Sequence, residues 1–510
     1  MRVRVFVVCV LRFNCVVCTA IKPGAIRTKV PKAIDMTTTL IRNAAAILSG
    51  QPGAASRLTG PDIRLRGTRI EAIGPLSPMP GETVVDATDC VVYPSWVNTH
   101  HHLFQSLLKG DAGGINLPLT GWLAATPCRF RAAFDEDLFR TAARIGLLEL
   151  ALSGCGTVAD HNYLYYPGMP FDSSAILFDE AERLGLRFVL CRGGATRSLQ
   201  AAAELPPALR PETLDAYLAD VERLTARYHD PAPDAMRRVV MAPTTPTYSL
   251  APTELRECAR TARRLGIRLH SHLSETVSYQ DNVHALHGLS PVRFVAEHEW
   301  LGPDVWFAHL VKLDAEEIAL LGSTRTGIAH CPQSNGRLGS GIAPVMALQA
   351  AGVPVSIGVD GAASNEAADM LSEVHAAWLM QRAAQGDKSQ PVFRGGAGEG
   401  ERVAVSADDV VAWGTSGGAT VLGLGAHLGG IGTLAPGMAA DLAIYALDDP
   451  RYFGLHDVAL GPVVSGGRPR LKALFVAGQE VVRNDVLQGL DVAELRHAAR
   501  AAVRRMMAVA

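Results

Sequence analysis

Short apolar segments alternate with helix-length segments across residues 91–420, and this alternation constrains the fold more than any other feature. Strands that alternate with helices form parallel sheets covered by helices, and eight such strands are the number in a (β/α)8 TIM barrel. An open, doubly wound sheet is the alternative, but no GxGxxG motif follows the first strand, which disfavours its dinucleotide-binding form. The expected strands are 90–98, 156–159, 187–191, 238–242, 267–270, 305–308, 327–329 and 353–359.

The two ends of the chain predict a second, smaller unit. Short apolar–polar alternations precede the barrel region at 40–48, 63–65, 69–73 and 83–86, and follow it at 441–446 and 471–477. We therefore expect an α/β protein in which a TIM barrel (91–420) is inserted into a small β-sandwich-like domain built from 36–90 and 421–490. Residues 491–510 are expected to form an amphipathic helix packed on that small domain.

Two further segments are expected to lie outside the folded core. Residues 1–35 resemble a signal peptide, but Arg12 and Asn14 interrupt the apolar run, which is too short to span a membrane as a helix. Because Met36 opens a natural first strand, we expect 1–35 to be a disordered extension or the product of a misassigned start; a cleaved export signal is the alternative. The glycine-rich stretch 394–400 is expected to be a flexible surface loop.

Charge and cysteine content exclude several classes of partner. A net charge of -2 and a pI near 6.8 give no reason to expect nucleic acid or an anionic membrane as a partner. The nine cysteines are scattered, and the one CxxC pair, Cys15 and Cys18, has no second pair or histidine cluster nearby. Neither a disulfide framework nor a cysteine zinc site is indicated, and a cytoplasmic location is expected.

Reactive polar residues follow nearly every expected strand, and the C-terminal ends of the strands are where a TIM barrel places its active site. A single such histidine would more often be an ordinary core or loop residue. Six of the eight strands end in a histidine or an acid, which is hard to explain without a site. In order, the residues are His100 and His102; Asp160 and His161; Arg192; Thr244 and Thr245; His272 and Glu275; His309; His330; and Asp360.

Four of these side chains form a set that suits a metal ion. His100 and His102 share a face if their segment is extended, and with His272 and Asp360 they supply three nitrogens and a carboxylate. That set suits one Zn²⁺ ion, or Fe²⁺ by ligand type alone, and such an ion lowers the pKa of a bound water towards neutrality. Asp360 could also accept the proton of that water, and His309 could hold the resulting hydroxide. No lysine ends the fourth strand, so a lysine-bridged two-metal site is not expected.

Glu275 is the candidate for proton transfer. It lies three residues after His272, where we expect it to reach the substrate and to carry a proton to a ring nitrogen or a leaving amine. The alternative is an ordinary acid at a helix N-terminus, where the dipole favours it.

The motifs NTHHH, HLSE, FAHLVKL, HCPQSN and GVDGAASN together resemble the amidohydrolase superfamily. The most similar branch contains the cytosine, guanine and 8-oxoguanine deaminases and the triazine hydrolases, and GTLAPGMAADLAIY resembles that branch's return to its small β domain. The resemblance implies homo-oligomers and one metal ion. By motif match its ligands are His100, His102, His272 and Asp360, with Glu275 and His309 as the catalytic pair.

Within that branch, the stretches WVNTHHHLFQSLLKG and RGGAT look most like enzymes that hydrolyse the 2-amino group of isoxanthopterin. For such a flat ring, Gln105 and Arg192 are the expected hydrogen-bonding contacts, with Trp122 and Tyr163 as walls. His161 and His330 are expected to shape the pocket, and His330 is the fifth expected substrate contact. Trp122 could instead cap the barrel mouth by packing, and Arg192 could pair with Asp160.

The predicted reaction is hydrolytic deamination of isoxanthopterin to 7-oxylumazine and ammonia, with a small heterocyclic substrate and water as the only partners. Deamination of 8-oxoguanine or guanine, or removal of an amine or chloride from a triazine, would use the same groups. A non-catalytic barrel is a distant alternative, because such a protein should have lost a ligand and every motif position is filled here.

Overall fold

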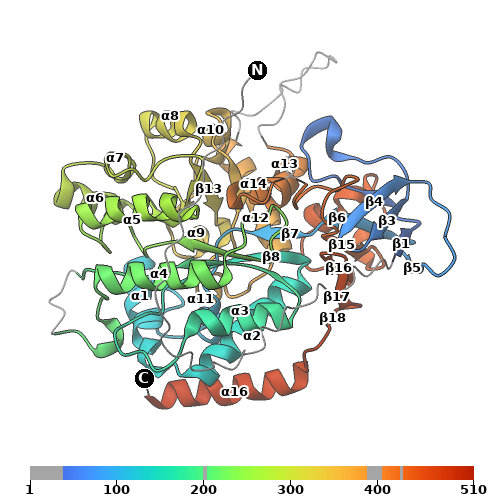
Figure 1. Ribbon diagram of the computed structural model, residues 1–510. Coiled ribbons are helices and arrows are strands. Elements are labelled where there is room, and N and C mark those ends of the chain that lie inside the picture. The colour runs from blue at the N-terminus through green and yellow to red at the C-terminus, as the bar shows by residue number, and fades with distance from the viewer. Residues whose placement is uncertain (1–37, 199–203, 387–404, 426–428, 510) are drawn as a thin grey trace, which may run out of the picture. The chain divides into compact units, whose positions relative to one another are not determined.

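The computed structural model describes residues 38–198, 204–386, 405–425 and 429–509 (Figure 1). The predictions for residues 1–35 and 394–400 lie outside these ranges. Within them, no helix combines the length and the apolar character needed to cross a bilayer.

Eight parallel strands form the barrel and follow one another around it in chain order, as predicted. The first and last strands are joined by backbone hydrogen bonds: the Thr99 N–H donates to the Ile357 carbonyl, and the Asp360 N–H donates to the His100 carbonyl, each at 3.0 Å. The second bond brings two predicted metal ligands together. The strands are β7 (Trp96–Asn98), β8 (Cys155–Asn162), β9 (Arg187–Arg192), β10 (Arg237–Met241), β11 (Arg268–Leu273), β12 (Val305–His309), β13 (Gly327–His330) and β14 (Val355–Ile357).

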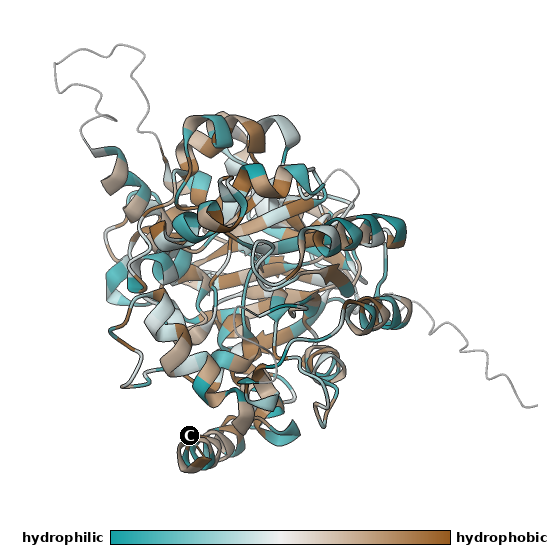
Figure 2. Cartoon of the chain, turned by 90° about the vertical axis from the view of Figure 1, so that its left-hand side faces the viewer, coloured by the Kyte–Doolittle hydropathy of each residue, from teal (hydrophilic) through white to brown (hydrophobic). Residues whose placement is uncertain are grey.

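Helices surround the barrel strands, and local signals set their ends. The Asp135 carboxylate caps the first long helix by accepting from the Leu138 N–H, and Gly266, at φ +69°, ends α5 in a conformation that disfavours other residues. Hydrophobic colour is concentrated in the strands and the hydrophilic colour on the helices' outer faces (Figure 2). The helices are α1 (Leu119–Leu123), α2 (Glu136–Leu152), α3 (Ser173–Arg183), α4 (Leu214–Tyr228), α5 (Pro252–Leu265), α6 (Val277–His287), α7 (Pro291–Glu297), α8 (Ala315–Thr324), α9 (Pro332–Arg337), α10 (Val345–Ala350), α11 (Ala362–Asn365), α12 (Met370–Gln385), α13 (Ala407–Ala412) and α14 (Gly418–Leu422).

Two further sheets come from the chain ends, as the sequence predicted. One has the order β4-β3-β1-β5; the other, β18-β17-β16-β15-β6-β2, combines strands from both ends of the chain. A separate apolar cluster packs between them, with Ile41, Ile63 and Leu65 from the first sheet and Leu442 and Phe475 from the second. The strands are β1 (Thr38–Arg42), β2 (Ala46–Ile47), β3 (Asp62–Arg66), β4 (Arg69–Gly74), β5 (Thr83–Asp86), β6 (Cys90–Pro94), β15 (Leu442–Ala446), β16 (Leu471–Val476), β17 (Gln479–Arg483) and β18 (Val486–Leu487).

Two expected strands are each divided between sheets, which corrects the prediction. Residues 90–98 form β6, which pairs with β15, and then β7, which enters the barrel. The break falls at Ser95, whose N–H donates to the Asp441 carbonyl. Residues 40–48 contribute to β1 and β2 in different sheets, because Asn43 between them adopts a positive φ of 64° and turns the chain.

The C-terminal helix α16 (Val492–Val509) packs against α2 of the barrel and not on the small sheets, as Figure 1 shows. Leu495, Ala502 and Met506 are its buried residues, and Arg505 pairs with Asp135 just before α2. Helix amphipathicity predicted a buried face correctly but could not identify the surface that covers it. The domain boundaries at residues 90 and 420 stay predictions.

Candidate active site

The four predicted metal ligands come from three places at the C-terminal ends of the barrel strands. His272 lies on β11, and Asp360 follows β14. His100 and His102 lie just after β7 and not within a strand, so the expected alternation of an extended strand does not orient them. A contact between their loop and the neighbouring strand orients them instead. The Asp160 carboxylate on β8 accepts a hydrogen bond from the Leu103 N–H at 2.6 Å and so fixes the backbone next to His102.

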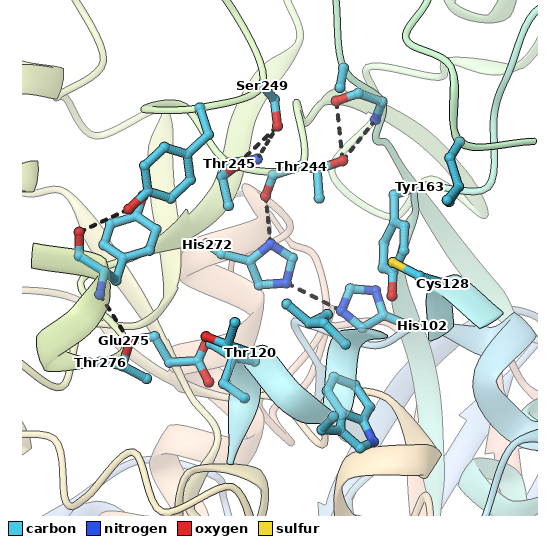
Figure 3. Close-up of a pocket in the computed structure, with 18 of the residues that line it drawn as sticks. His102, Thr120, Cys128, Tyr163, Thr244, Thr245, Ser249, His272, Glu275 and Thr276 are labelled. Atoms are coloured by element: carbon cyan, nitrogen blue, oxygen red, sulfur yellow. Dashed lines mark hydrogen bonds between the residues drawn. The ribbon is translucent and has the colours of Figure 1, made fainter. Parts of the chain in front are cut away.

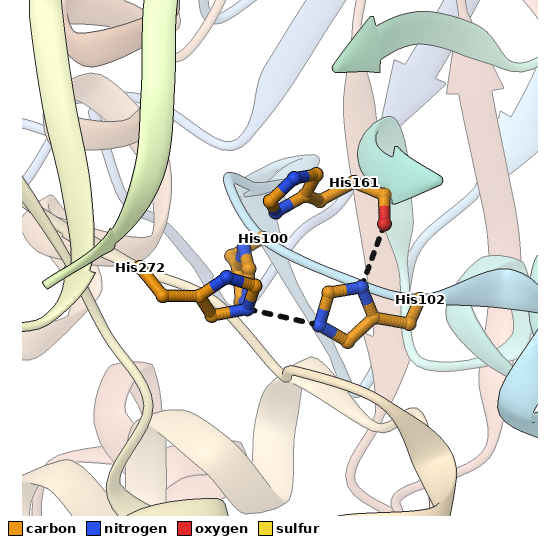
Figure 4. Close-up of side chains that lie close together, drawn as sticks. All are labelled: His100, His102, His161 and His272. Carbon is orange, nitrogen blue, oxygen red and sulfur yellow. Dashed lines mark hydrogen bonds between the residues drawn. The ribbon is translucent and has the colours of Figure 1, made fainter. Parts of the chain in front are cut away.

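Figure 4 shows the three histidines of this set turned towards one another, and Asp360 lies beside them. The Nε2 atoms of His102 and His272 are 3.2 Å apart, and Asp360 Oδ1 lies 3.3 Å from His100 Nε2 and 3.2 Å from His102 Nε2. All four side chains are buried or nearly so. Groups that could hold a metal ion, with ligand atoms within 4.8 Å of one another, are His100, His102, His161 and His272, and also His100, His309 and Asp360.

The far nitrogen of each ligand histidine is held by the protein. His102 Nδ1 is 2.7 Å from the His161 carbonyl, and His272 Nδ1 is 2.6 Å from the Thr244 carbonyl. Because a carbonyl only accepts, both Nδ1 atoms carry the proton, and the Nε2 lone pairs are directed at the common point.

His100 is oriented through a second histidine. His270 Nδ1 donates to the Trp306 carbonyl at 3.0 Å, which leaves His270 Nε2 as an acceptor for His100 Nδ1 at 2.8 Å. The opposite nitrogen, His100 Nε2, is buried and makes no hydrogen bond within the described residues. A buried lone pair without a donor fits a metal ligand, so the residues present fit a divalent ion.

Burial and charge set the protonation states that a metal requires. Burial holds the pKa values of His100 and His272 well below the ordinary value, which keeps both imidazoles neutral. Burial alone would raise the pKa of Asp360, but its contacts with His100 and His102 outweigh this and hold that pKa well below the usual range. Neutral imidazoles and an ionised carboxylate are the forms that bind cations.

Glu275 and His309 lie beside this group. His309 Nε2 is 3.7 Å from Glu275 Oε2 and 4.0 Å from Asp360 Oδ2, while His309 Nδ1 is 2.9 Å from Asn335 Oδ1. Ser340 donates to Glu275 Oε1 at 3.1 Å, and burial raises the pKa of Glu275. Its helix α6 begins only at Val277, so Glu275 precedes the helix and faces the cavity.

The backbone is strained at two of these side chains. His309 has φ +77° and Asp360 has φ +60°, a left-handed conformation that non-glycine residues rarely adopt. Strain of this kind persists where the surrounding structure holds it and clusters at functional sites.

A cavity of about 400 Å³ opens over the ligand group and is lined by Glu275, His309 and Asp360. Figure 3 shows Glu275, His272 and His102 in its wall. Gln105 Nε2 donates to the Tyr163 hydroxyl at 2.8 Å, and both side chains line the cavity. Trp122 also lines it and donates through Nε1 to the Ala363 carbonyl at 3.1 Å. Three of the five predicted substrate contacts therefore lie on the cavity wall: Gln105, Trp122 and Tyr163.

Arg192 and His330 do not lie on that wall. Arg192 does not pair with Asp160, the predicted alternative, but with Glu212 at 2.7 Å and Asp220 at 3.0 Å. His330 is buried, with neither ring nitrogen hydrogen-bonded within the described part of the chain, and burial lowers its pKa to about 3. The prediction of direct substrate contact through these two residues does not match their positions.

Residues 91–481 match the Amidohydrolase family model, more than half of the chain. The chain belongs to the amidohydrolase family. This confirms the family that the five motifs indicated.

Two curated relatives match this amidohydrolase over more than nine-tenths of its chain. It is 67% identical over 473 residues to an isoxanthopterin deaminase from an unknown prokaryotic organism, covering 92% of this chain and 97% of that one. It is 38% identical over 474 residues to the 8-oxoguanine deaminase of Pseudomonas aeruginosa, covering 93% and 100%.

Solved structures agree with the fold. An amidohydrolase from an environmental sample of the Sargasso Sea superposes with a TM-score of 0.79 at 61% identity, over 92% of this chain and 99% of that one. The atrazine chlorohydrolase TrzN from Arthrobacter aurescens TC1, crystallised with zinc, superposes with a TM-score of 0.82 at 28% identity, over 91% and 100%.

Several cavity residues of this amidohydrolase were not found from the sequence. They include Arg131, Thr120, Cys128 and Tyr248. None follows a barrel strand directly, so the rule that selected strand-end residues passed over them. Thr244 and Thr245, which do follow a strand, were found by that rule and line the cavity.

Proposed function

We propose that this amidohydrolase is a hydrolytic deaminase of a pterin, converting isoxanthopterin to 7-oxylumazine and ammonia. The observation that carries the proposal is the 67% identity to an isoxanthopterin deaminase over 97% of that protein. The converging histidines, the buried acid and the adjoining cavity supply the groups that such a reaction needs. The 38% identity to an 8-oxoguanine deaminase supports deamination of that purine as the second candidate.

We propose one divalent ion per chain, held by His100, His102, His272 and Asp360. Three imidazole nitrogens and one carboxylate favour Zn²⁺, with Fe²⁺ as the alternative, and the similarity to a zinc-bound chlorohydrolase supports zinc. When bound there, such an ion is a Lewis acid that lowers the pKa of a water ligand towards neutrality.

Glu275 is the proposed proton carrier. Its raised pKa lets the carboxyl keep a proton over a wider pH range, which suits a group that protonates the ring nitrogen next to the reacting carbon. Water adds its oxygen to that carbon and the bond from carbon to the amino nitrogen breaks. One proton of the water goes to the amine, which leaves as ammonia, and the other replaces the proton that Glu275 gave to the ring nitrogen. Ser340, which donates to Glu275 Oε1, leaves the other oxygen facing His309.

His309 and Asp360 are proposed to hold the attacking water. Asn335 fixes the His309 ring through Nδ1 and leaves Nε2 directed towards Glu275 and Asp360. Asp360 Oδ2 accepts from Ser334 at 2.6 Å, so the carboxylate is fixed in rotation and placed to accept a proton from the water.

The cavity wall is proposed to position the flat ring. Trp122 and Tyr163 supply aromatic surface, and Tyr163 is fixed by its hydrogen bond to Gln105. Gln105 Oε1 is buried without a partner within the described residues and can accept a hydrogen bond from a ring N–H. The cytoplasmic location and homo-oligomeric state stay predictions.

The test is ammonia release from purified, metal-analysed protein given isoxanthopterin and 8-oxoguanine in parallel. We expect a higher kcat/KM for isoxanthopterin. A higher value for 8-oxoguanine would keep the residue roles and overturn the substrate. No ammonia from either, with a metal ion bound, would contradict deamination of fused rings and direct the search to triazines.

A further inference from the structure

We propose that Arg131 is the arginine that recognises the substrate. It donates a hydrogen bond to an oxo oxygen, or to a negatively charged oxygen, on the part of the heterocycle remote from the reacting amino group. The inference rests on the proposed function and narrows it. The substrates are then fused two-ring heterocycles with the reacting amino group on one ring and such an oxygen on the other.

Arg192, which the sequence suggested as a substrate contact, already has its charge balanced by carboxylates of the protein. Its Nη1 and Nη2 donate to the two carboxylate oxygens of Glu212, each at 2.7 Å, and its Nε donates to Asp220 at 3.0 Å. The guanidinium also lies over the rings of Tyr165 and Tyr217. Arg192 already has two acidic partners and does not line the cavity, so it is not placed to bind a ligand there.

Arg131 has the opposite environment. It lines the cavity, and its guanidinium is fixed by carbonyl oxygens: Nε donates to Ala208 at 2.5 Å, and Nη2 donates to Tyr163 at 2.8 Å and Tyr165 at 2.7 Å. Within the described residues, no carboxylate lies within ion-pair distance of it, and Nη1 makes no hydrogen bond.

A cation in this position favours a ligand with negative charge. Burial lowers the pKa of Arg131, which reflects the cost of holding its charge away from water. A ligand oxygen at Nη1 would offset that cost through a charge-assisted hydrogen bond. Because the guanidinium is already fixed, little side-chain entropy would be lost on binding.

The distribution of charge along the cavity places this oxygen away from the reacting carbon. Among the described residues that line the cavity, the acids are Glu275 and Asp360, both in or beside the metal group. Arg131 makes no hydrogen bond or ion pair with that group within the described chain. Two exposed arginines, Arg197 and Arg210, also line the cavity. The part of the cavity lined by these arginines therefore favours a substrate edge that is anionic or rich in hydrogen-bond acceptors.

The test compares two ring systems that differ only in the proposed oxygen. Isoxanthopterin carries an oxo group on its second ring and pterin does not; 8-oxoguanine and guanine form the equivalent pair. We expect Arg131→Gln to lower kcat/KM for isoxanthopterin about 10- to 100-fold, mainly through KM, and to change pterin by less than about threefold. Equal losses for both rings, or no loss for either, would overturn the proposal.

Arg129→Gln is the matched control, because Arg129 lies two residues earlier, is exposed and does not line the cavity. Arg129→Gln should leave kcat/KM unchanged for both isoxanthopterin and pterin. If Arg131→Gln fails to fold, Arg131→Lys serves instead, since lysine keeps the positive charge but lacks the planar guanidinium and its fixed set of N–H donors. We expect the isoxanthopterin-to-pterin ratio of kcat/KM to fall several-fold; an unchanged ratio would reject the role.

Binding separates this proposal from the proposed function. Isoxanthopterin affinity is measured by its fluorescence on the Glu275→Gln background, with and without Arg131→Gln. Tighter binding with Arg131 present would support the recognition site even if the wild-type protein prefers another ring. Equal affinities would reject Arg131 while leaving any measured deaminase activity standing.

Discussion

His100 shows how a single residue is fixed in this site. One ring nitrogen contacts His270, which is fixed in turn by the Trp306 carbonyl, and the other is left buried without a donor. His102 and His272 repeat the arrangement with backbone carbonyls. Orientation of the ligands therefore depends on a surrounding layer of acceptors as much as on the ligands themselves.

At this scale, replacing Glu275 by glutamine removes the acidic proton and keeps the shape of the side chain. We expect kcat to fall at least about 10²-fold, because proton transfer by a positioned group contributes about 10²–10⁴. Metal content should stay unchanged, since Glu275 is not one of the proposed ligands. Ammonia release and metal analysis on the same sample measure both; substantial turnover by this variant would reject the proton-carrier role.

His270→Phe tests the acceptor behind His100. Phenylalanine can keep the stacking on Trp306, where the ring centroids are 4.5 Å apart, but leaves the Nδ1–H of His100 buried without an acceptor. We expect metal affinity to fall about 10- to 100-fold in a chelator competition. His298→Phe is the control, because His298 is also buried against an aromatic ring but contacts none of the ligands. Equal affinities for the two variants would show that His270 does not orient the ligand.

The residues that the sequence could identify are those that follow a strand. His100, His102 and Asp360 do so, His272 and His309 are the last or next-to-last residues of their strands, and a parallel barrel brings all such strand ends together. Arg131 could not be found this way, because it lies more than 20 residues from the end of β7 and from the start of β8. The partners of Arg192 are 20 and 28 residues away along the chain and carry no signal of their contact.

At the scale of elements, the sequence predicted the barrel strands well because each is short, apolar and bounded by polar residues. It could not divide 90–98 or 40–48, since both halves of each run are apolar and only pairing partners separate them. The surface under α16 was also unpredictable, because amphipathicity defines a buried face without naming its neighbour.

The packing of α16 against α2 gives a prediction at this scale. Met506 is 2% exposed and its neighbour Met507 is 55% exposed. We expect Met506→Ala to lower the free energy of unfolding by about 2 kcal/mol or more, through lost burial and a cavity. Met507→Ala should change it by less than about 0.5 kcal/mol. Denaturant unfolding of both variants measures this, and equal effects would argue against the docking of α16 on α2.

At the scale of the whole molecule, the chain ends meet in one sheet. Strand β15 pairs with β6, about 350 residues earlier in the chain, and β6 leads directly into β7 and the histidines that follow it. The small sheets thereby anchor the segment that carries half of the proposed ligands. That both ends would join could be predicted from their shared strand pattern, whereas the strand order could not.

Metal titration tests the central claim, that one ion at this site supports deamination. Metal-free protein is titrated with Zn²⁺ while ammonia release from isoxanthopterin is followed. We expect no activity without metal, then a linear rise that levels off near one ion per chain. Full activity in the metal-free protein, or a plateau only at two ions per chain, would contradict the account.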